Sequence, residues 1–298
     1  MKTIINVLLA VALACMMQGC DNFEYHPYAS NIHGNIDVNR QNIARISSTV
    51  KSLPMKFVFL TDTQTSYDEL DEAIGVIKRR GDIDFIIHGG DQTDFGLPKE
   101  FMWCRDLLEK SGIPFFAVIG NHDCLGNGDY TFEYVYGAKN YSFNVAGVHF
   151  LCLNTNALEY DYSEPVPDLD FIENDAVEVA SLNASQPGSV THTVVVMHAC
   201  PYDEQFNNNV AKPFRNYLRY FPGISDGDDT LEVSAGVPEQ TFKSYKRGFC
   251  INGHNHRLSI NNIYNDDLLF YQCPNMAKRC FFVFEIDADG YEMEVVEY

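Results

Sequence analysis

The sequence predicts an α/β fold from two observations: strand-like and helix-like segments alternate, and five of the strand-like segments end in polar residues. From Met55 onward, the run KFVFL precedes a segment with apolar residues at i, i+3, i+4 and i+7 from Leu70, and DFIIH follows. A second predicted helix begins after Pro98, a favoured first-turn residue, and leads into PFFAVI. This rhythm indicates parallel strands joined by helices.

The second half of the chain continues with the same kinds of element. YSFNV and VHFLCL flank Ala146-Gly147 and predict a β-hairpin. A third helix is expected at about 168–182, before the strand THTVVVM. Residues 202–246 are irregular and rich in Asn, Asp and Gly, with one short helical segment near 214–220. The chain then returns to strands at GFCIN, LLFYQ, FFVFEI and YEMEVVEY.

Charge is the unusual feature of the composition. Hydrophobic residues make up 46% of the chain and charged residues 21%, which excludes a collagen-like, coiled-coil or mainly disordered protein. A chain of 298 residues can bury a core without disulfides or structural metals. However, 41 acidic residues against 21 basic ones give a formal net charge of −20. Such an acidic protein repels nucleic acid and anionic lipid, which disfavours both as electrostatic partners.

The N-terminus predicts export and a lipid anchor. Lys2 precedes an apolar run at 4–17, which is too short to span a bilayer but fits a signal peptide, so residues 1–19 are expected to be removed. The sequence Met-Gln-Gly before Cys20 resembles a bacterial lipobox, which predicts lipidation of Cys20 and a place in the bacterial cell envelope, in the periplasm or at the cell surface. Removing Lys2 changes the formal charge from −20 to −21, so acyl chains would hold the protein at a membrane. Ordinary cleavage with an incidental Cys20 is the alternative.

Three segments are therefore expected: the signal peptide at 1–19, a tether and N-terminal extension at 20–54, and one domain at 55–298. The second segment is polar and has no long apolar period. Seven cysteines follow Cys20, an odd number without CxxC pairs, so at least one should be a free thiol. We interpret them as buried small hydrophobic residues.

Five predicted strands end directly in residues that can bind metal ions. In open α/β sheets, ligand sites form at the carboxyl ends of strands, so these groups are expected to converge. A single His after a strand is more often a structural residue, but five such groups favour one shared site. The groups are Asp62-Thr63-Gln64, Asp91, Asn121-His122-Asp123, His198 and His254-Asn255-His256.

These residues carry a resemblance to the calcineurin-like metallophosphoesterases. The blocks DxQ, GD, GNHD, H and GHxH occur in the family's order, and the resemblance spans residues 55–298. GNHD and GHxH are the most specific of them. The resemblance implies two mixed β-sheets packed as a sandwich flanked by helices, a four-layer fold, with two metal ions at the sheet ends.

The resemblance also implies which residues hold two divalent metal ions. Asp91 would bridge them, because its two carboxylate oxygens can each serve one cation. Two divalent ions against the carboxylates of Asp62 and Asp91 leave a local charge of about +2, which can attract a phosphate to an acidic protein. The first site would consist of Asp62, Gln64, Asp91 and His256, and the second site of Asp91, Asn121, His198 and His254.

The implied reaction is hydrolysis of a phosphoester by a hydroxide that two metal ions, about 3.5 to 4 Å apart, generate from water. His122 resembles the family's non-ligand histidine, which would stabilise the transition state or protonate the leaving alkoxide. Asp94 matches the family position that orients this histidine; a solvated loop acid is the alternative. Asp123 is interpreted as a loop-capping residue.

Gln64 departs from the family pattern, which most often has His at this position. An amide oxygen is a harder and weaker donor than imidazole, so it suits Mn or Fe(II) better than Zn. We therefore expect the ion of the first site to be the more exchangeable one, with Mn, Fe or Zn as candidates overall. The alternative is that Gln64 is a structural hydrogen-bonding residue and that the centre holds one metal ion.

Other polar residues receive weaker assignments. The acidic stretch 226–229 lacks EF-hand spacing and is interpreted as a solvated loop, and His88 as a structural residue. Tyr160 and Tyr162 could line a substrate pocket or pack in the core. Five basic residues of the irregular segment could contact a substrate anion or be surface charges: Arg215, Arg219, Lys243, Lys246 and Arg247.

Two functions of different classes follow. The first is a metal-dependent phosphoesterase that acts outside the cytoplasm on a small phosphomonoester or phosphodiester. The second is a lipoprotein that keeps the fold and a metal for binding or structure, with little turnover. The complete ligand set and His122 favour the enzyme. The sequence gives neither the substrate nor the oligomeric state.

Overall fold

The computed structural model describes residues 31–224 and 241–298. The predicted signal peptide, the predicted lipid attachment at Cys20, the first part of the predicted tether and the acidic stretch 226–229 lie outside the described residues.

The described strands form two mixed sheets of six strands each. The first sheet has the order β3-β2-β1-β11-β12-β7, and the second has the order β4-β5-β6-β8-β10-β9. Strands β1, β2 and β3 run parallel, as do β5, β6, β8 and β10. The strands are β1 Met55–Leu60, β2 Phe85–His88, β3 Phe115–Ala117, β4 Tyr141–Val145, β5 Val148–Cys152, β6 His192–Val196, β7 Thr241–Ser244, β8 Gly248–Asn252, β9 Ser259–Asn261, β10 Phe270–Gln272, β11 Cys280–Ile286 and β12 Tyr291–Glu297.

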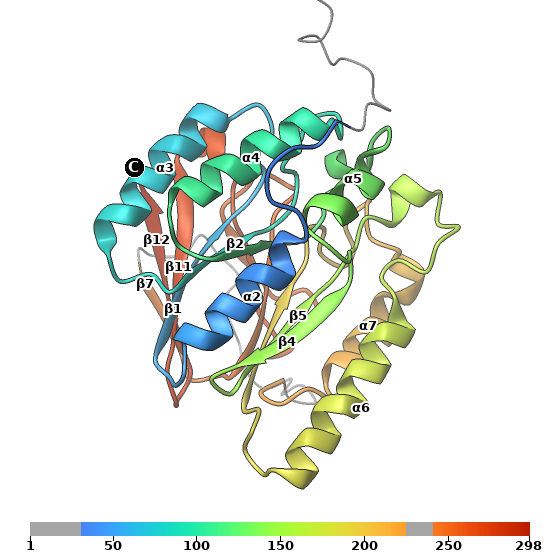
Figure 1. Cartoon of the computed structure of the whole chain (residues 1–298). Helices are drawn as coiled ribbons and strands as arrows, with labels where there is room; N and C mark the ends of the chain where they lie inside the picture. The colour runs from blue at the N-terminus through green and yellow to red at the C-terminus, as the bar shows by residue number, and fades with distance from the viewer. Residues whose placement is uncertain (1–30, 225–240) are drawn as a thin grey trace, which may run out of the picture.

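The sheets pack face to face, and helices cover their outer faces (Figure 1). α3, α4 and α5 pack on the first sheet, and α6 and α7 pack on the second. Within the described residues, no helix is both long and apolar enough to span a bilayer. The helices are α3 Tyr67–Arg80, α4 Pro98–Lys110, α5 Gly128–Val135, α6 Leu169–Ser185 and α7 Ala211–Leu218, and short 3-10 helices are η2 His122–Cys124, η3 Ala157–Tyr160, η4 Asn208–Val210 and η5 Met276–Lys278.

The alternation of side chains along β1 shows why its sequence is apolar without interruption from Phe57 to Leu60. Phe57 and Phe59 face the space between the sheets, whereas Val58 and Leu60 face the helices. Both faces of the strand are therefore buried, which removes the polar alternation of a half-exposed strand. Phe57 stacks on neighbours from β2 and β11 at ring-centroid distances of 5.2 and 5.3 Å. This aromatic core fixes the strands whose ends carry the predicted site.

A helix in the predicted N-terminal extension belongs to the packed core. α2, Val38–Thr49, lies against β3 and β4, and its Ile46 packs between the two sheets. Asn39 donates to the carbonyl of Ala117 and accepts from its N–H, each at 2.9 Å. This amide satisfies the backbone of Ala117 in β3, an edge strand of the first sheet. Residues 38–49 are thus no tether, and the domain boundary at residue 54 stays a prediction.

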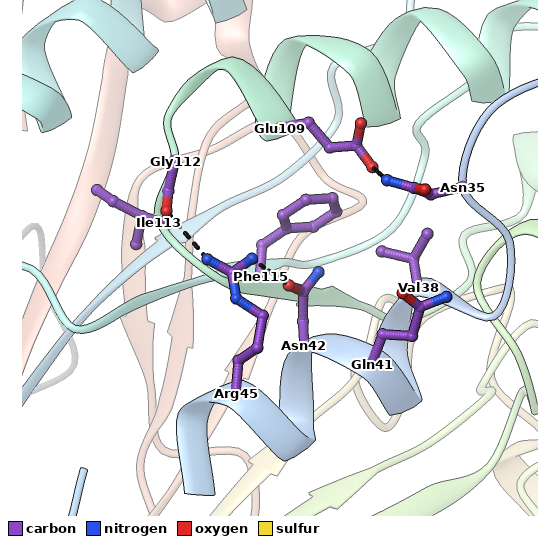
Figure 2. A pocket seen from close by; sticks show the side chains of 9 residues that line it. All are labelled: Asn35, Val38, Gln41, Asn42, Arg45, Glu109, Gly112, Ile113 and Phe115. Atoms are coloured by element: carbon purple, nitrogen blue, oxygen red, sulfur yellow. Dashed lines mark hydrogen bonds between the residues drawn. The ribbon is translucent and has the colours of Figure 1, made fainter. Parts of the chain in front are cut away.

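A cavity of about 270 Å³ lies between α2 and α4 (Figure 2). Asn35 donates to Glu109 at 2.7 Å, and Arg45 donates to Asn42 at 3.0 Å and to the carbonyl of Gly112 at 3.2 Å. Because these polar groups already bond to one another, we interpret the cavity as a packing seam between two helices.

The cysteines of the described residues are free thiols. Six of the seven are buried, and Cys124 is half-buried. Burial raises the pKa of the Cys104 thiol to about 12, so this thiol stays protonated and unreactive at neutral pH. The interpretation of these residues as small hydrophobic side chains is confirmed.

Candidate metal centre

The predicted ligands lie at the carboxyl ends of strands from both sheets. Asp62 follows β1 and Asp91 follows β2, and the N–H of Asp62 donates to the carbonyl of Gly90 at 2.9 Å. His198 follows β6 and His254 follows β8, and the N–H of Gly253 donates to the carbonyl of His198 at 3.1 Å. Neighbouring parallel strands therefore deliver their polar ends to one place, as predicted.

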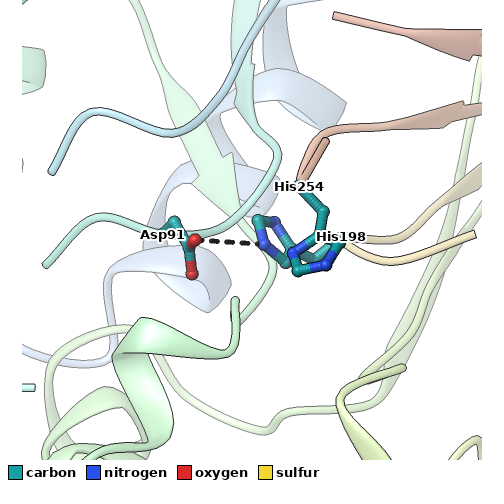
Figure 3. Close-up of side chains that lie close together, drawn as sticks. All are labelled: Asp91, His198 and His254. Atoms are coloured by element: carbon teal, nitrogen blue, oxygen red, sulfur yellow. Dashed lines mark ion pairs between the residues drawn. The ribbon is translucent and has the colours of Figure 1, made fainter. Parts of the chain in front are cut away.

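The residues of the predicted second site meet closely, and Figure 3 shows three of them, Asp91, His198 and His254. His198 Nε2 lies 3.2 Å from Asp91 Oδ2 and 3.1 Å from Asn121 Oδ1. His254 Nδ1 lies 2.9 Å from the same Asn121 oxygen. One ligand atom from each of Asp91, His198 and His254 lies within 4.8 Å of the others, a grouping of the size that one metal ion needs.

Hydrogen bonds on the far sides of the two imidazoles direct lone pairs into the second site. His198 Nδ1 donates to the carbonyl of Gly89 at 2.9 Å, so the neutral ring has its lone pair on Nε2. His254 Nε2 lies 3.0 Å from Asp203 Oδ1, which leaves the lone pair on Nδ1. Both lone pairs face the oxygen of Asn121. With both rings neutral, these lone pairs would repel the oxygen, so the arrangement fits a cation.

The protonation of His198 in the metal-free protein supports the same fit. Burial lowers the pKa of His198, but the carboxylates of Asp91 and Asp62 outweigh this effect and raise its pKa to about 10. Burial likewise raises the pKa of Asp91, but the charge of His198 outweighs it and holds the pKa below its usual value. A proton on His198 thus occupies the place that a divalent ion would take, and metal uptake would release it.

The first site is less regular than the second. His256 Nε2 lies 3.1 Å from Asp62 Oδ1, while Asp62 Oδ2 accepts from Thr61 Oγ1 at 2.7 Å. Gln64 Nε2 donates to Asp91 Oδ2 at 3.2 Å, so the amide nitrogen rather than the oxygen faces the bridging carboxylate. Gln64 Oε1 is buried, and no described residue hydrogen-bonds to it. Rotating the amide by half a turn would present this oxygen to an ion, and Gln64 stays a predicted ligand.

Four of the predicted ligands have a strained backbone, and the bridging carboxylate of Asp91 is closely packed. Asp62, Asp91, His254 and His256 all have positive φ angles, of 53°, 57°, 74° and 54°. Such angles are costly for residues with a Cβ and concentrate at functional sites. Gly120 makes room for the bridging carboxylate, because a Cβ there would lie 2.1 Å from Asp91 Oδ1.

His122 is held by two backbone contacts beside the ligands. Its N–H donates to Asp91 Oδ1 at 2.9 Å, and its Nδ1 donates to the backbone carbonyl of Asp94, also at 2.9 Å. The Asp94 carboxylate is 3.6 Å from Nδ1, beyond hydrogen-bond distance. Asp94 therefore orients His122 through its main chain, and the imidazole keeps Nε2 available for substrate.

Asp123 and His88 brace the ligand loops, in agreement with their structural interpretation. Asp123 accepts from the backbone N–H groups of Gln92, Thr93 and Gly120 at 2.9 to 3.2 Å. Burial, with a further effect of Asp91, raises the pKa of Asp123 to about 7. Burial lowers the pKa of His88 to about 3, so the ring is neutral.

Within residues 31–224 and 241–298, two of the five basic residues of the irregular segment contact acidic residues. Arg215 is buried and contacts Asp266 at 2.7 Å, and Lys246 contacts Asp267 at 2.8 Å. Tyr160 approaches Cys124, with its hydroxyl 3.6 Å from Sγ. Tyr162 donates to the carbonyl of Glu204 at 3.0 Å, which ties two loops together.

The sequence did not indicate Asp203, whose carboxylate contacts the predicted ligand His254. It lies in the irregular segment, where its neighbours form no recognisable block. Its position five residues after His198, at the same end of the sheet, is the signal that could have indicated it.

The comparisons with known proteins identify the class of the protein and then its family. The fold and site belong to a metal-dependent phosphoester hydrolase. The chain is a member of the calcineurin-like phosphoesterase family, whose family model matches residues 55–258, a range that contains all seven predicted ligands. A comparison with curated proteins found no match. The predicted fold class and enzyme class are confirmed, and the family implies two divalent metal ions.

Solved structures share the fold at low sequence identity. A dimetal phosphatase from Danio rerio has a TM-score of 0.54 and 13% identity, covering 82% of this chain and 98% of that one. A purple acid phosphatase from yellow lupin (Lupinus luteus) seeds has a TM-score of 0.55 and 12% identity, covering 83% and 52%. This chain thus spans about half of the lupin enzyme. GAP50, described as the anchor in the inner membrane complex of Plasmodium, has a TM-score of 0.50 and 15% identity, covering 82% and 84%.

The close approach at Gly120 gives a direct test of the bridging carboxylate. Gly120→Ala should displace Asp91 and weaken binding of both ions at least about tenfold if Asp91 serves both sites, as the family resemblance implies. The measurement is the metal content per chain after dialysis against a series of free-metal concentrations. Gly75→Ala is the matched control, since its Cβ would meet only Arg79 at 3.4 Å. Wild-type metal content in a folded Gly120→Ala protein would contradict the bridging role.

Proposed function

We propose that this phosphoesterase hydrolyses a small phosphomonoester or phosphodiester outside the cytoplasm, while a lipid on Cys20 holds it at a membrane of the bacterial envelope. The observation that carries the enzymatic part is the convergence of side-chain oxygen and nitrogen atoms from Asp91, Asn121, His198 and His254 at one partly buried point. When two divalent ions are bound, they activate water as the nucleophile and neutralise the phosphoryl oxygens.

The chain's own residues supply the remaining chemistry. His122 Nδ1 donates to the carbonyl of Asp94, so Nε2 is the ring atom that can act on substrate. In its protonated form this atom would donate to the leaving oxygen or to a phosphoryl oxygen. Asp91 holds the His122 backbone with Oδ1, which couples the position of this imidazole to the metal centre.

Charge supports a compact substrate. The formal charge of −20, or −21 without the predicted signal peptide, opposes the approach of an extended polyanion. A local cationic centre can still attract a single phosphate group. Small phosphoesters therefore suit this protein better than nucleic acid does.

The first experiment asks for metal-dependent turnover. With added Mn or Fe, the wild-type protein should hydrolyse p-nitrophenyl phosphate or its bis-ester, and Asp91→Ala should be inactive. His122→Ala should lower kcat about 10² to 10⁴-fold, as expected for loss of a general acid. Asp94→Ala should lower kcat much less, because the backbone carbonyl that orients His122 remains.

Metal content of each variant, measured on the same samples, separates loss of chemistry from loss of ions. No metal-dependent turnover on these compounds or on a broad phosphoester panel would instead favour the second function, a lipoprotein that keeps the fold and metal for binding.

Gln64 tests whether the first site is the exchangeable one and favours Mn or Fe. Gln64→His should retain the first ion better than wild type during dialysis, because imidazole is the stronger donor. Element analysis of both proteins after parallel dialysis makes the comparison. If both proteins retain two ions equally, the ion of the first site is not the more exchangeable one. If both proteins retain a single ion, Gln64 is a structural residue and no ligand.

The lipid anchor is tested in the full chain expressed in a bacterium. Wild type should enter the membrane fraction and incorporate labelled fatty acid, whereas Cys20→Ser should do neither. Cys15→Ser is the matched control, because Cys15 lies within the predicted signal peptide and should be dispensable. Identical labelling of wild type and Cys20→Ser would show that Cys20 carries no lipid.

A further inference from the structure

We propose that Asp203 is a positioning residue that fixes His254 as an Nδ1 metal donor and makes the second site the tighter of the two. This inference rests on the two-metal centre of the proposed function. It concerns a residue outside the five sequence blocks and beyond the predicted ligand set.

Asp203 reaches the centre from a loop of its own. The loop follows His198 and precedes η4, and Asp203 Oδ1 lies 3.0 Å from His254 Nε2. The carboxylate accepts from the N–H of Gln205 at 3.0 Å and from Asn255 Nδ2 at 2.7 Å. Its side chain is only 9% exposed. These bonds fix the carboxylate before any metal ion arrives.

The contact determines which nitrogen of His254 can bind a metal ion. An ionised carboxylate only accepts hydrogen bonds, so the proton of a neutral His254 resides on Nε2. The lone pair is then on Nδ1, which lies 2.9 Å from Asn121 Oδ1 in the second site. A carboxylate behind a ligating histidine also makes the imidazole a stronger donor and holds its orientation.

The other histidine of the same block lacks this support. His256 Nδ1 faces the side-chain amide of Asn275 at 3.3 Å, a longer contact with a neutral group. The His256 side chain is 43% exposed, against 13% for His254. The two histidines come from one short loop, yet among the described residues a carboxylate contacts the ring nitrogen that points away from the metal site only at His254. We infer unequal affinities, with the second site filled first.

A purely structural role for Asp203 is the competing explanation, because the same carboxylate also binds Asn255. The two roles can be separated by variants. Asp203→Ala removes its contacts with His254, Asn255 and the N–H of Gln205. Asp203→Asn keeps the volume and one acceptor oxygen, and Asn255→Ala removes only the contact between Asn255 and Asp203.

The experiment combines Mn²⁺ titration with the tautomer of His254. Calorimetric titration of the metal-free full chain should give a tight and a weak site. Asp203→Ala should weaken the tight site about 10 to 100-fold and leave the weak site unchanged, with Asp203→Asn in between. Asn255→Ala should weaken the tight site less than Asp203→Ala does, because the contact between Asp203 and His254 remains. In ¹⁵N-histidine spectra of the metal-free proteins, His254 should be protonated at Nε2 in wild type and lose this preference in Asp203→Ala.

The outcomes distinguish the inference from the proposed function. A wild-type protein that binds no divalent ion overturns both. A wild type that binds two ions, together with an Asp203→Ala protein of unchanged affinities and unchanged His254 tautomer, overturns the inference alone. Equal weakening of both sites, or equal losses in Asp203→Ala and Asn255→Ala, would show that Asp203 only braces the loop.

Discussion

Oxygen and nitrogen atoms from Asp91, Asn121, His198 and His254 gather at one place, and three contacts of 2.9 to 3.2 Å connect them. Without a positive charge between them these atoms would repel, and in the metal-free protein the raised pKa of His198 supplies a proton. A divalent ion can replace that proton and bind all four residues. The family membership of the chain and the geometry of the site therefore point to the same requirement, a cation at the ends of the strands.

The rest of the fold holds this unfavourable arrangement in place. Packing between the sheets and under the helices keeps the parallel strands aligned, so their ends cannot separate. The ligand residues with positive φ angles store backbone strain that this packing must offset. The Asp123 carboxylate accepts hydrogen bonds from three backbone N–H groups, two after Asp91 and one at Gly120. These bonds connect the loop at 120–123 to the loop that follows Asp91. The ligand residues with positive φ angles therefore lower the stability of the fold while they provide the metal centre.

Much of the fold and site could be predicted, because the relevant signals are local. Strands buried on both faces appear as uninterrupted apolar runs, and the ligand blocks follow them directly. The split into two sheets came from the family resemblance, since pairings such as β1 with β11 join segments far apart in the chain. The sequence of α2 shows no helical spacing of apolar residues, because two of its four buried residues, Asn39 and Asn42, are polar. Asp203 was missed because its role depends on a contact across 51 residues of sequence.

Anomalous diffraction from crystals grown with Mn²⁺ and phosphate tests the central claim most directly. The account predicts two metal peaks that share Asp91 as a ligand, one of them also bound by Asn121, His198 and His254. Phosphate should bind to both ions, near His122. A single peak, or peaks away from Asp91, would contradict the two-metal centre.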